Sequence, residues 1–308
     1  MNDRDRYIGC LLGLAVGDAY GAPFEGTWNG SFEPPDRFEK GGFHDSNPGE
    51  WTDDTSLALC LADSLLSKKA LDLNDVAERF LRWHREGYKS SREVAFGIGG
   101  TCRKAIESFE ETGKAESGPD EYNSAGNGSI MRLAPVPMVY AHDPLLSAEM
   151  SEKSSRVTHQ AQQALDCCRI LGYTLASLLG GSSKAQVLNS LQRAFEREVH
   201  NEVIPIINGS YKTTSSETIS TTAYVVQTLE AAFWAFWNSS GFFEGLKKLV
   251  ALGGDTDTTG AVYGQIAGAF YGRDGIPEQL VDELNDTESI QGKAVSLLQL
   301  SNEFANGK

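Results

Sequence analysis

Apolar residues recur every three or four positions along most of this chain, which is the spacing of one face of an α-helix. The clearest stripe contains Leu57, Leu61 and Leu65. Comparable patterns predict further helices over residues 75–83, 100–109, 160–179 and 222–237. The alternation typical of a strand comes nearest at residues 199–207, where Pro205 argues against pairing in a sheet. The pattern therefore predicts an all-α protein. Loops are expected at residues 28–50, 112–127 and 208–217.

Two series of glycines are spaced four residues apart, so each series lies on one face of a helix. The first comprises Gly9, Gly13, Gly17 and Gly21, and the second comprises Gly260, Gly264, Gly268 and Gly272. Glycine inside a helix costs about 0.5–1 kcal/mol relative to alanine, so these glycines need a structural reason. We expect them to let the backbones of two core helices approach each other closely.

Two acidic clusters stand at the starts of predicted helices. The first is Thr52-Asp53-Asp54-Thr55, and the second is residues 253–260, which contain Asp255, Thr256, Asp257 and Thr258. Carboxylates accompanied by hydroxyl groups suit a hard divalent cation, because Mg²⁺, Mn²⁺ and Ca²⁺ take oxygen ligands. If the clusters meet in the fold, they supply ligands for one or two ions. Asp and Thr are also common N-cap residues, so helix capping is the alternative for each cluster taken alone.

The composition limits the classes of protein to consider. The 308 residues allow one large domain or two ordinary ones, and no linker marks a boundary, so we expect one domain over residues 1–308. With 40% apolar and 22% charged residues, the chain can bury a substantial core. The formal net charge of −15 argues against a nucleic-acid partner, because binding nucleic acid needs a basic surface.

The cysteines and the N-terminal residues indicate the compartment. The five cysteines form no C-x-x-C pair and are odd in number, which favours reduced, buried thiols. The apolar stretch over residues 8–17 is too short to span a bilayer, and Asp18 ends it. We therefore expect a cytoplasmic protein with no membrane partner and no signal peptide.

Five motifs, taken together, resemble one known family. They are residues 9–25 (GCLLGLAVGDAYGAPFE), 51–56 (WTDDTS), 125–132 (AGNGSIMR), 156–159 (RVTH) and 253–261 (GGDTDTTGA). In this order they resemble the ADP-ribosylglycohydrolase family, whose founding members reactivate ADP-ribosylated nitrogenase reductase. The resemblance extends from residue 9 to beyond residue 270, which is nearly the whole chain.

The resemblance implies a fold, a metal centre and a reaction. The fold is a compact, all-α orthogonal helical bundle with a metal cleft, and the cofactors are two divalent metal ions, Mg²⁺ or Mn²⁺. The reaction is hydrolysis of the glycosidic bond between ADP-ribose and an acceptor, which passes through an oxocarbenium-like state. The implied metal ligands are Thr52, Asp53, Asp54, Asp255, Asp257 and Thr258. The implied catalytic residues are Glu25, Asp53, Asp54 and Asp257, with Glu25 as a catalytic base or a gating ligand.

The glycine-rich motif and the later histidine indicate a substrate site. Glycine-rich segments offer backbone N–H groups to a diphosphate, as anion-binding nests do. The candidate substrate-binding residues are Gly126, Asn127, Gly128, Ser129 and His159. The alternatives are that Glu25 is an ordinary solvated carboxylate and that His159 is a structural histidine. We expect Arg132 to be structural, buried against loop carbonyls or a carboxylate.

The chain departs from the nitrogenase-reactivating members at positions that bear on the acceptor. Those members carry acidic residues where this chain has Gly97, Gly100, Tyr122 and Ser124. Acidic groups there would pair with the guanidinium of an ADP-ribosylated arginine. The residues that can substitute for them are Asp120, Glu121, His44 and Asp45. Many relatives also have Pro or Asn after the histidine, where this chain has Gln160.

Three functions follow from these observations. The first is a metal-dependent ADP-ribosyl-acceptor hydrolase, acting as a monomer on an ADP-ribosylated protein side chain, such as Arg or Ser, or on a small conjugate. The second is a catalytically silent protein that binds metal and ADP-ribose. The third is a hydrolase of nucleotide phosphoanhydrides on the same fold.

Overall fold

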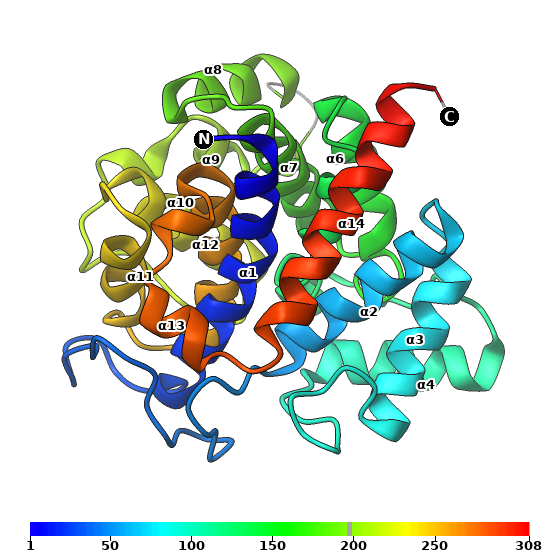
Figure 1. The fold of residues 1–308 in the computed structure, drawn as a ribbon, viewed down its shortest axis with the longest axis horizontal. Helices are drawn as coiled ribbons and strands as arrows, with labels where there is room; N and C mark the ends of the chain where they lie inside the picture. The colour runs from blue at the N-terminus through cyan, green and yellow to red at the C-terminus, as the bar shows by residue number, and fades with distance from the viewer. Residues whose placement is uncertain (196–198, 308) are drawn as a thin grey trace.

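The computed structural model describes residues 1–195 and 199–307, and within them the chain is helical with no named strand (Figure 1). The first helices are α1 (Asp3–Gly21), α2 (Asp53–Lys68), α3 (Leu73–Glu86), α4 (Gly100–Thr112), α5 (Pro135–Val139), α6 (Pro144–Ser155) and α7 (Gln162–Leu179). The later helices are α8 (Lys184–Phe195), α9 (Ile204–Ile207), α10 (Val225–Trp237), α11 (Phe242–Val250), α12 (Thr256–Tyr271), α13 (Glu278–Glu283) and α14 (Thr287–Ala305). The all-α prediction is therefore confirmed.

The predicted helices occur close to their expected bounds. The Leu57 stripe lies in α2, and residues 75–83, 100–109, 160–179 and 222–237 correspond to α3, α4, α7 and α10. The segment 199–207 is no strand: α9 begins at Ile204, and Pro205 occupies its first turn. Proline is accepted there because the first N–H groups of a helix have no partner within it.

The two glycine series hold α1 against α12 in antiparallel orientation. A Cβ atom built on each facing glycine would overlap a backbone carbonyl group of the other helix, so the backbones are in direct contact. The facing pairs are Gly9 with Gly268, Gly13 with Gly264, Gly17 with Gly260 and Gly21 with Thr256. The prediction of close approach is confirmed, with one correction. Gly272 lies beyond the end of α12 with a φ of +74°, so it terminates the helix.

The remaining helices pack around this central pair. α14 lies beside α1, α2 packs on α3 and α3 on α4, while α6 packs on α7 at the opposite end of the molecule (Figure 1). Buried apolar side chains from α1 to α14 form one connected core. A connected core is what the prediction of one domain over residues 1–308 requires. All five cysteines are free and buried within this fold.

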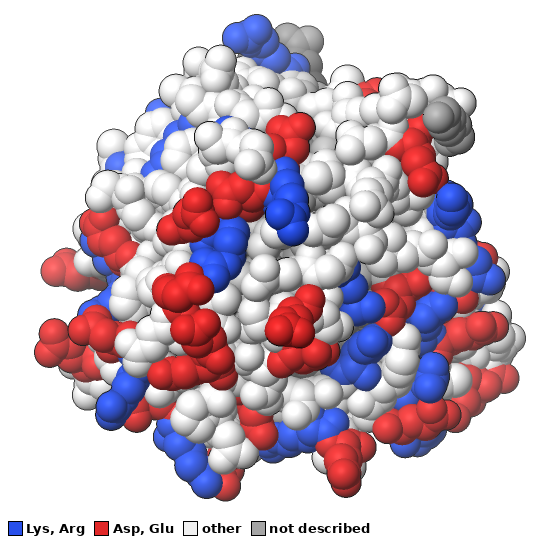
Figure 2. All heavy atoms as spheres, viewed as in Figure 1, with Lys and Arg blue, Asp and Glu red and all other residues white. Residues whose placement is uncertain are grey.

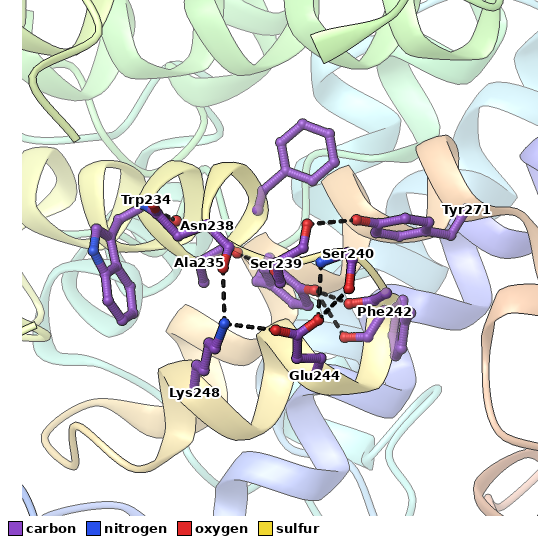
Figure 3. A network of polar contacts seen from close by, with 12 residues as sticks. Trp234, Ala235, Asn238, Ser239, Ser240, Phe242, Glu244, Lys248 and Tyr271 are labelled. Carbon is purple, nitrogen blue, oxygen red and sulfur yellow. Dashed lines mark hydrogen bonds and ion pairs between the residues drawn. The ribbon is translucent and has the colours of Figure 1, made fainter. Parts of the chain in front are cut away.

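The turn between α10 and α11 is fixed by a network of polar contacts (Figure 3). Glu244 accepts hydrogen bonds from the N–H and hydroxyl groups of Ser240 at 2.9 and 2.6 Å, and it pairs with Lys248 at 2.6 Å. The hydroxyl of Tyr271, at the end of α12, donates to the carbonyl of Ser239 at 3.0 Å. The Tyr271 hydrogen bond holds this turn against α12, and α11 leads directly into the second acidic cluster.

The surface carries both signs of charge. On the face shown in Figure 2, acidic and basic side chains are interspersed, and the described atoms of this face form no continuous basic surface. This distribution agrees with the net charge of −15. Among the helices of residues 1–195 and 199–307, none has the length and apolar character needed to cross a membrane.

Candidate active site

The fold brings the two acidic clusters together at one cleft. α2 begins at Asp53 and α12 begins at Thr256, and the α1–α12 contact places the two helix starts close to each other. The cleft has a volume of about 210 Å³. It is lined by Asp53 of the first cluster and by Asp255, Asp257 and Thr258 of the second. Thr52 and Asp54 are fully buried directly beside this wall.

Helix capping does not account for either cluster. Thr52 and Asp255 occupy the N-cap positions of α2 and α12, but neither side chain accepts a hydrogen bond from a backbone N–H of its own helix. An N-cap residue ordinarily stabilises its helix through that hydrogen bond. The side chains of the two clusters are therefore available to the cleft.

Asp18 is a site residue that the sequence reasoning missed. Its carboxylate is fully buried and accepts hydrogen bonds from the N–H and hydroxyl groups of Thr52, at 3.0 and 2.9 Å, and of Thr55, at 3.0 and 2.6 Å. In the sequence, Asp18 marks only the end of an apolar stretch. A signal for Asp18 is present in the sequence, because it is a carboxylate on an otherwise apolar, glycine-rich helix. Such a helix is expected to be buried, and a buried charge needs hydrogen-bond or charged partners.

Burial and mutual repulsion raise the pKa values of these carboxylates. Burial, opposed by the threonine donors, raises the pKa of Asp18 to about 6. Burial and the neighbouring charges of Asp18 and Asp255 raise the pKa of Asp53 to about 7. The same two causes, burial first, raise the pKa values of Asp54 and Asp257 well above the usual range. Added positive charge would stabilise the anionic form of carboxylates crowded in this way.

The donor set fits a hard divalent cation. The carboxylate and hydroxyl oxygens at the cleft are the ligands that Mg²⁺ and Mn²⁺ prefer. Asp54 Oδ1 is buried and has no hydrogen-bond partner in the described part of the chain. In the described part of the chain, no group of three Asp, Glu, His or Cys side chains is arranged around one possible ion position. Asp255 instead accepts from Asn127 at 2.8 Å, and Asp257 accepts from the N–H of Thr258 at 2.8 Å.

Glu25 lies at the cleft, as the sequence predicted. Its carboxylate lines the cavity with Asp53, and its Oε2 atom is 3.2 Å from Nε2 of His44. The side chain is 32% exposed, so it is partly buried and is not an ordinary solvated glutamate. His44 belongs to the long 28–50 loop. It is one of the four residues that could substitute for the missing acidic groups, and its contact with Glu25 brings it to the cleft.

The glycine-rich motif forms the opposite wall of the cleft. Gly126, Asn127 and Gly128 line the cavity. The amide of Asn127 donates to Asp255 Oδ2 and also to the hydroxyl of Thr228, at 3.0 Å, so it connects this wall to the second acidic cluster. The side chain of Ser129 is not in the cleft, because its hydroxyl is buried against Cys168 at 3.3 Å.

A buried arginine holds this wall against His159. Arg132 donates to the carbonyl of Gly128 and, at 2.7 Å, to the hydroxyl of Thr158, which confirms the structural role expected for it. The Thr158 hydroxyl lies 2.8 Å from Nδ1 of His159. Burial and the charge of Arg132 lower the pKa of His159 to about 3, so the imidazole is neutral. Its Nε2 atom lies beside Gly126 and Gly128 of the glycine wall.

Gly97 explains one departure from the expected acidic residues. Its φ is +87°, and a Cβ atom built on it would lie 2.5 Å from Oδ1 of Asp53 and 3.3 Å from Cβ of Thr52. A side chain here would therefore displace the first acidic cluster.

The geometry agrees with comparisons to known proteins. A profile of the ADP-ribosylglycohydrolase family matches residues 1–306. The ADP-ribosylarginine hydrolases Tri1 of Serratia proteamaculans and Pseudomonas putida are 37% and 39% identical, over 97% and 95% of this chain and 80% and 78% of their own. The ADP-ribosyl-[dinitrogen reductase] glycohydrolase of Rhodospirillum rubrum is 33% identical over 92% of this chain and 91% of its own.

A solved structure shows the same fold. It is described as an ADP-ribosylglycohydrolase-related protein complex, and it matches with a TM-score of 0.87 and 38% identity over 97% of this chain and 99% of that one. The helical fold and the carboxylate-lined cleft define a hydrolase that acts on glycosyl bonds. The chain belongs to the ADP-ribosylglycohydrolase family.

Proposed function

We propose that this protein hydrolyses the glycosidic bond between ADP-ribose and an acceptor side chain, in a reaction that depends on Mg²⁺ or Mn²⁺. One observation carries the proposal: carboxylates from two distant clusters, together with Glu25, line a single cleft. Glycosidic cleavage requires carboxylates near the anomeric carbon to stabilise positive charge and to move protons.

The metal centre of the proposal uses the residues at the two helix starts. Two ions would be held by the six residues that the sequence indicated, namely Thr52, Asp53, Asp54, Asp255, Asp257 and Thr258. When bound, the ions would act as Lewis acids on the oxygen atoms of the sugar. They would also stabilise the ionised form of the carboxylates whose pKa values burial raises. Asn127, which donates to Asp255, orients one of these carboxylates.

The other cleft residues have distinct roles in the proposal. Glu25 is the candidate general base, because it is a partly buried carboxylate beside His44 that is directed to the cavity. The N–H groups of Gly128 and Ser129 donate no hydrogen bond to the described part of the chain, so they are free for the diphosphate. The neutral imidazole of His159 adds a ring nitrogen to the same wall.

Arginine is the acceptor that the proposal favours. Two relatives at 37% and 39% identity are named ADP-ribosylarginine hydrolases. Acidic residues are absent at Gly97 and Gly100, and the carboxylates that line the same cleft are those of Glu25, Asp53, Asp255 and Asp257. Of these four, Glu25 is the one outside both acidic clusters. In this proposal Glu25 pairs with the guanidinium of the acceptor while it serves the reaction. The cytoplasmic location and the monomeric state stay predictions.

The test measures free ADP-ribose by HPLC after incubation with ADP-ribosyl-arginine and ADP-ribosyl-serine peptides of matched sequence. Metal-dependent release that EDTA and Asp257→Ala abolish, with more release from the arginine peptide, is the expected result. Asp282→Ala, which removes an exposed carboxylate of α13, is the matched control. Release of AMP without free ADP-ribose would indicate a phosphoanhydride hydrolase. Tight ADP-ribose binding without turnover on any conjugate would indicate the catalytically silent binding protein.

A further inference from the structure

We infer that Asp18 is a positioning residue that caps α2 from a neighbouring helix and holds the first acidic cluster in its metal-binding arrangement. The inference rests on the proposed metal-dependent function and adds to it a residue outside both acidic clusters. Three observations carry it: the cap on α2, the direction of one hydroxyl group, and the place of Asp18 on α1.

The cap on α2 comes from outside the helix. With Thr52 at the N-cap, Thr55 is the third residue of the helix, and its N–H is one that an N-cap side chain ordinarily satisfies. Here that N–H donates to Asp18 Oδ2 at 3.0 Å, and the N–H of Thr52 also donates to Asp18. Asp18 thereby satisfies the start of α2. The side chain of Asp53 consequently lines the cleft, and that of Asp54 lies buried beside it.

Asp18 also determines the direction of the Thr52 hydroxyl. A hydroxyl carries one proton, and a cation binds it through a lone pair on the oxygen. Thr52 Oγ1 lies 2.9 Å from Asp18 Oδ1 and 3.0 Å from Asp54 Oδ2. Asp18 also accepts a hydrogen bond from the N–H of Thr52. When the Thr52 hydroxyl donates its proton to Asp18, the lone pairs of Oγ1 lie on the side of Asp54. That is the orientation in which Thr52 can serve as a metal ligand.

The position of Asp18 on α1 connects it with the second cluster. Its neighbour Gly17 is in backbone contact with Gly260, and Gly21, one turn later, contacts Thr256 at the start of α12. The same two turns of α1 therefore contact both helix starts. Asp18 holds α2, and the glycines hold α12, so α1 sets the separation of the two acidic clusters.

The experiment measures the affinity of Mn²⁺ alone for the full chain by isothermal titration calorimetry. Asp18→Asn preserves the shape but turns an amide donor toward the donors of Thr52 and Thr55. Replacing the partner of a metal ligand typically weakens metal binding by roughly 10–100-fold, and we expect a loss in this range. Asp166→Asn is the matched control. Asp166, on α7, is as buried as Asp18, and its carboxylate accepts a hydrogen bond from the N–H of His200 at 2.8 Å. Its Mn²⁺ affinity should equal that of the wild type.

A second pair of variants keeps the test decisive if Asp18→Asn does not fold. Thr55→Val removes the hydroxyl hydrogen bond to Asp18, and Thr55→Ser retains it. We expect weaker Mn²⁺ binding in the valine variant and wild-type binding in the serine variant. Equal affinities in wild type, Asp18→Asn and Thr55→Val would overturn the inference. A wild-type protein that binds no Mn²⁺ would instead refute the proposed metal-dependent function.

Discussion

Gly17 of α1 and Gly260 of α12 lie backbone against backbone, and a Cβ atom on either residue would overlap the carbonyl group of the other. This contact brings two helix starts from opposite ends of the sequence to one cleft. Glycine is required by the close approach and not by an unusual backbone conformation, since Gly17 and Gly260 are inside regular helices. The pair thus connects packing in the core directly with the geometry of the site.

Gly17→Ala should destabilise the protein, because the added methyl group has to separate α1 from α12. Overpacking of a core typically costs about 1–3 kcal/mol. Gly292→Ala is the control: Gly292 is exposed inside α14, and nothing lies within 4 Å of its added Cβ. The same substitution there should stabilise by about 0.5–1 kcal/mol. Urea unfolding measures the change in the free energy of unfolding for both variants. If both substitutions stabilised the protein, or both destabilised it, the close-approach interpretation would be contradicted.

Gly97→Ala should impair hydrolysis more than folding. The added Cβ would lie 2.5 Å from Oδ1 of Asp53, so the carboxylate has to move. Misplacement of a reacting group by about 1 Å can cost on the order of a hundredfold in rate, and we expect kcat/KM to fall by about that factor. Gly30→Ala controls for backbone strain, because Gly30 also has a positive φ, +71°, but open space around it. Equal kcat/KM losses in the two variants would show that strain, and not Asp53, is responsible.

The free energy of unfolding of the metal-free protein should fall as the pH rises from about 4 to about 7. The pKa values of Asp18 and Asp53 are about 6 and about 7 in the folded state and about 3.9 in an unfolded chain. In that interval the folded state binds more protons than the unfolded state, so raising the pH favours unfolding. Each unit of pKa difference corresponds to about 1.4 kcal/mol, which gives an expected loss of a few kcal/mol.

Urea unfolding in EDTA across this pH range tests the prediction. Asp53→Asn removes one of the titrating groups and should reduce the pH dependence. Saturating Mn²⁺ should restore stability at pH 7, because the cation replaces the protons. Stability that increases between pH 5 and pH 7 in EDTA would show that these carboxylates are already ionised in the folded protein.

Glu25→Gln should lower kcat while Mn²⁺ affinity stays at the wild-type value. A general base typically contributes about 10²–10⁴-fold to the rate, and glutamine cannot accept the proton. Glu33→Gln, an exposed position of the same loop, is the matched control for kcat and for affinity. Calorimetry with Mn²⁺ and initial rates on the arginine peptide separate the two possible roles. A large loss of Mn²⁺ affinity would identify Glu25 as a metal ligand.

Local patterns determined much of this protein. The spacing of Leu57, Leu61 and Leu65 is enough to predict a helix, because one buried stripe needs only a period of 3.6 residues. The glycine series predicted a close contact, and the acidic clusters predicted carboxylates at two helix starts. These are properties of short segments, so their sequence alone expresses them.

Tertiary structure decided what those segments do together. Asp18 was unremarked as a site residue because its partners, Thr52 and Thr55, are distant in sequence, and only the packing of α1 brings them to it. The same packing removed the capping alternative and turned the hydroxyl of Ser129 away from the cleft. The sequence predicted the two acidic clusters and the glycine-rich motif as the residues of the site. Packing determined which of them meet, because contacts between distant segments depend on how the helices fit together.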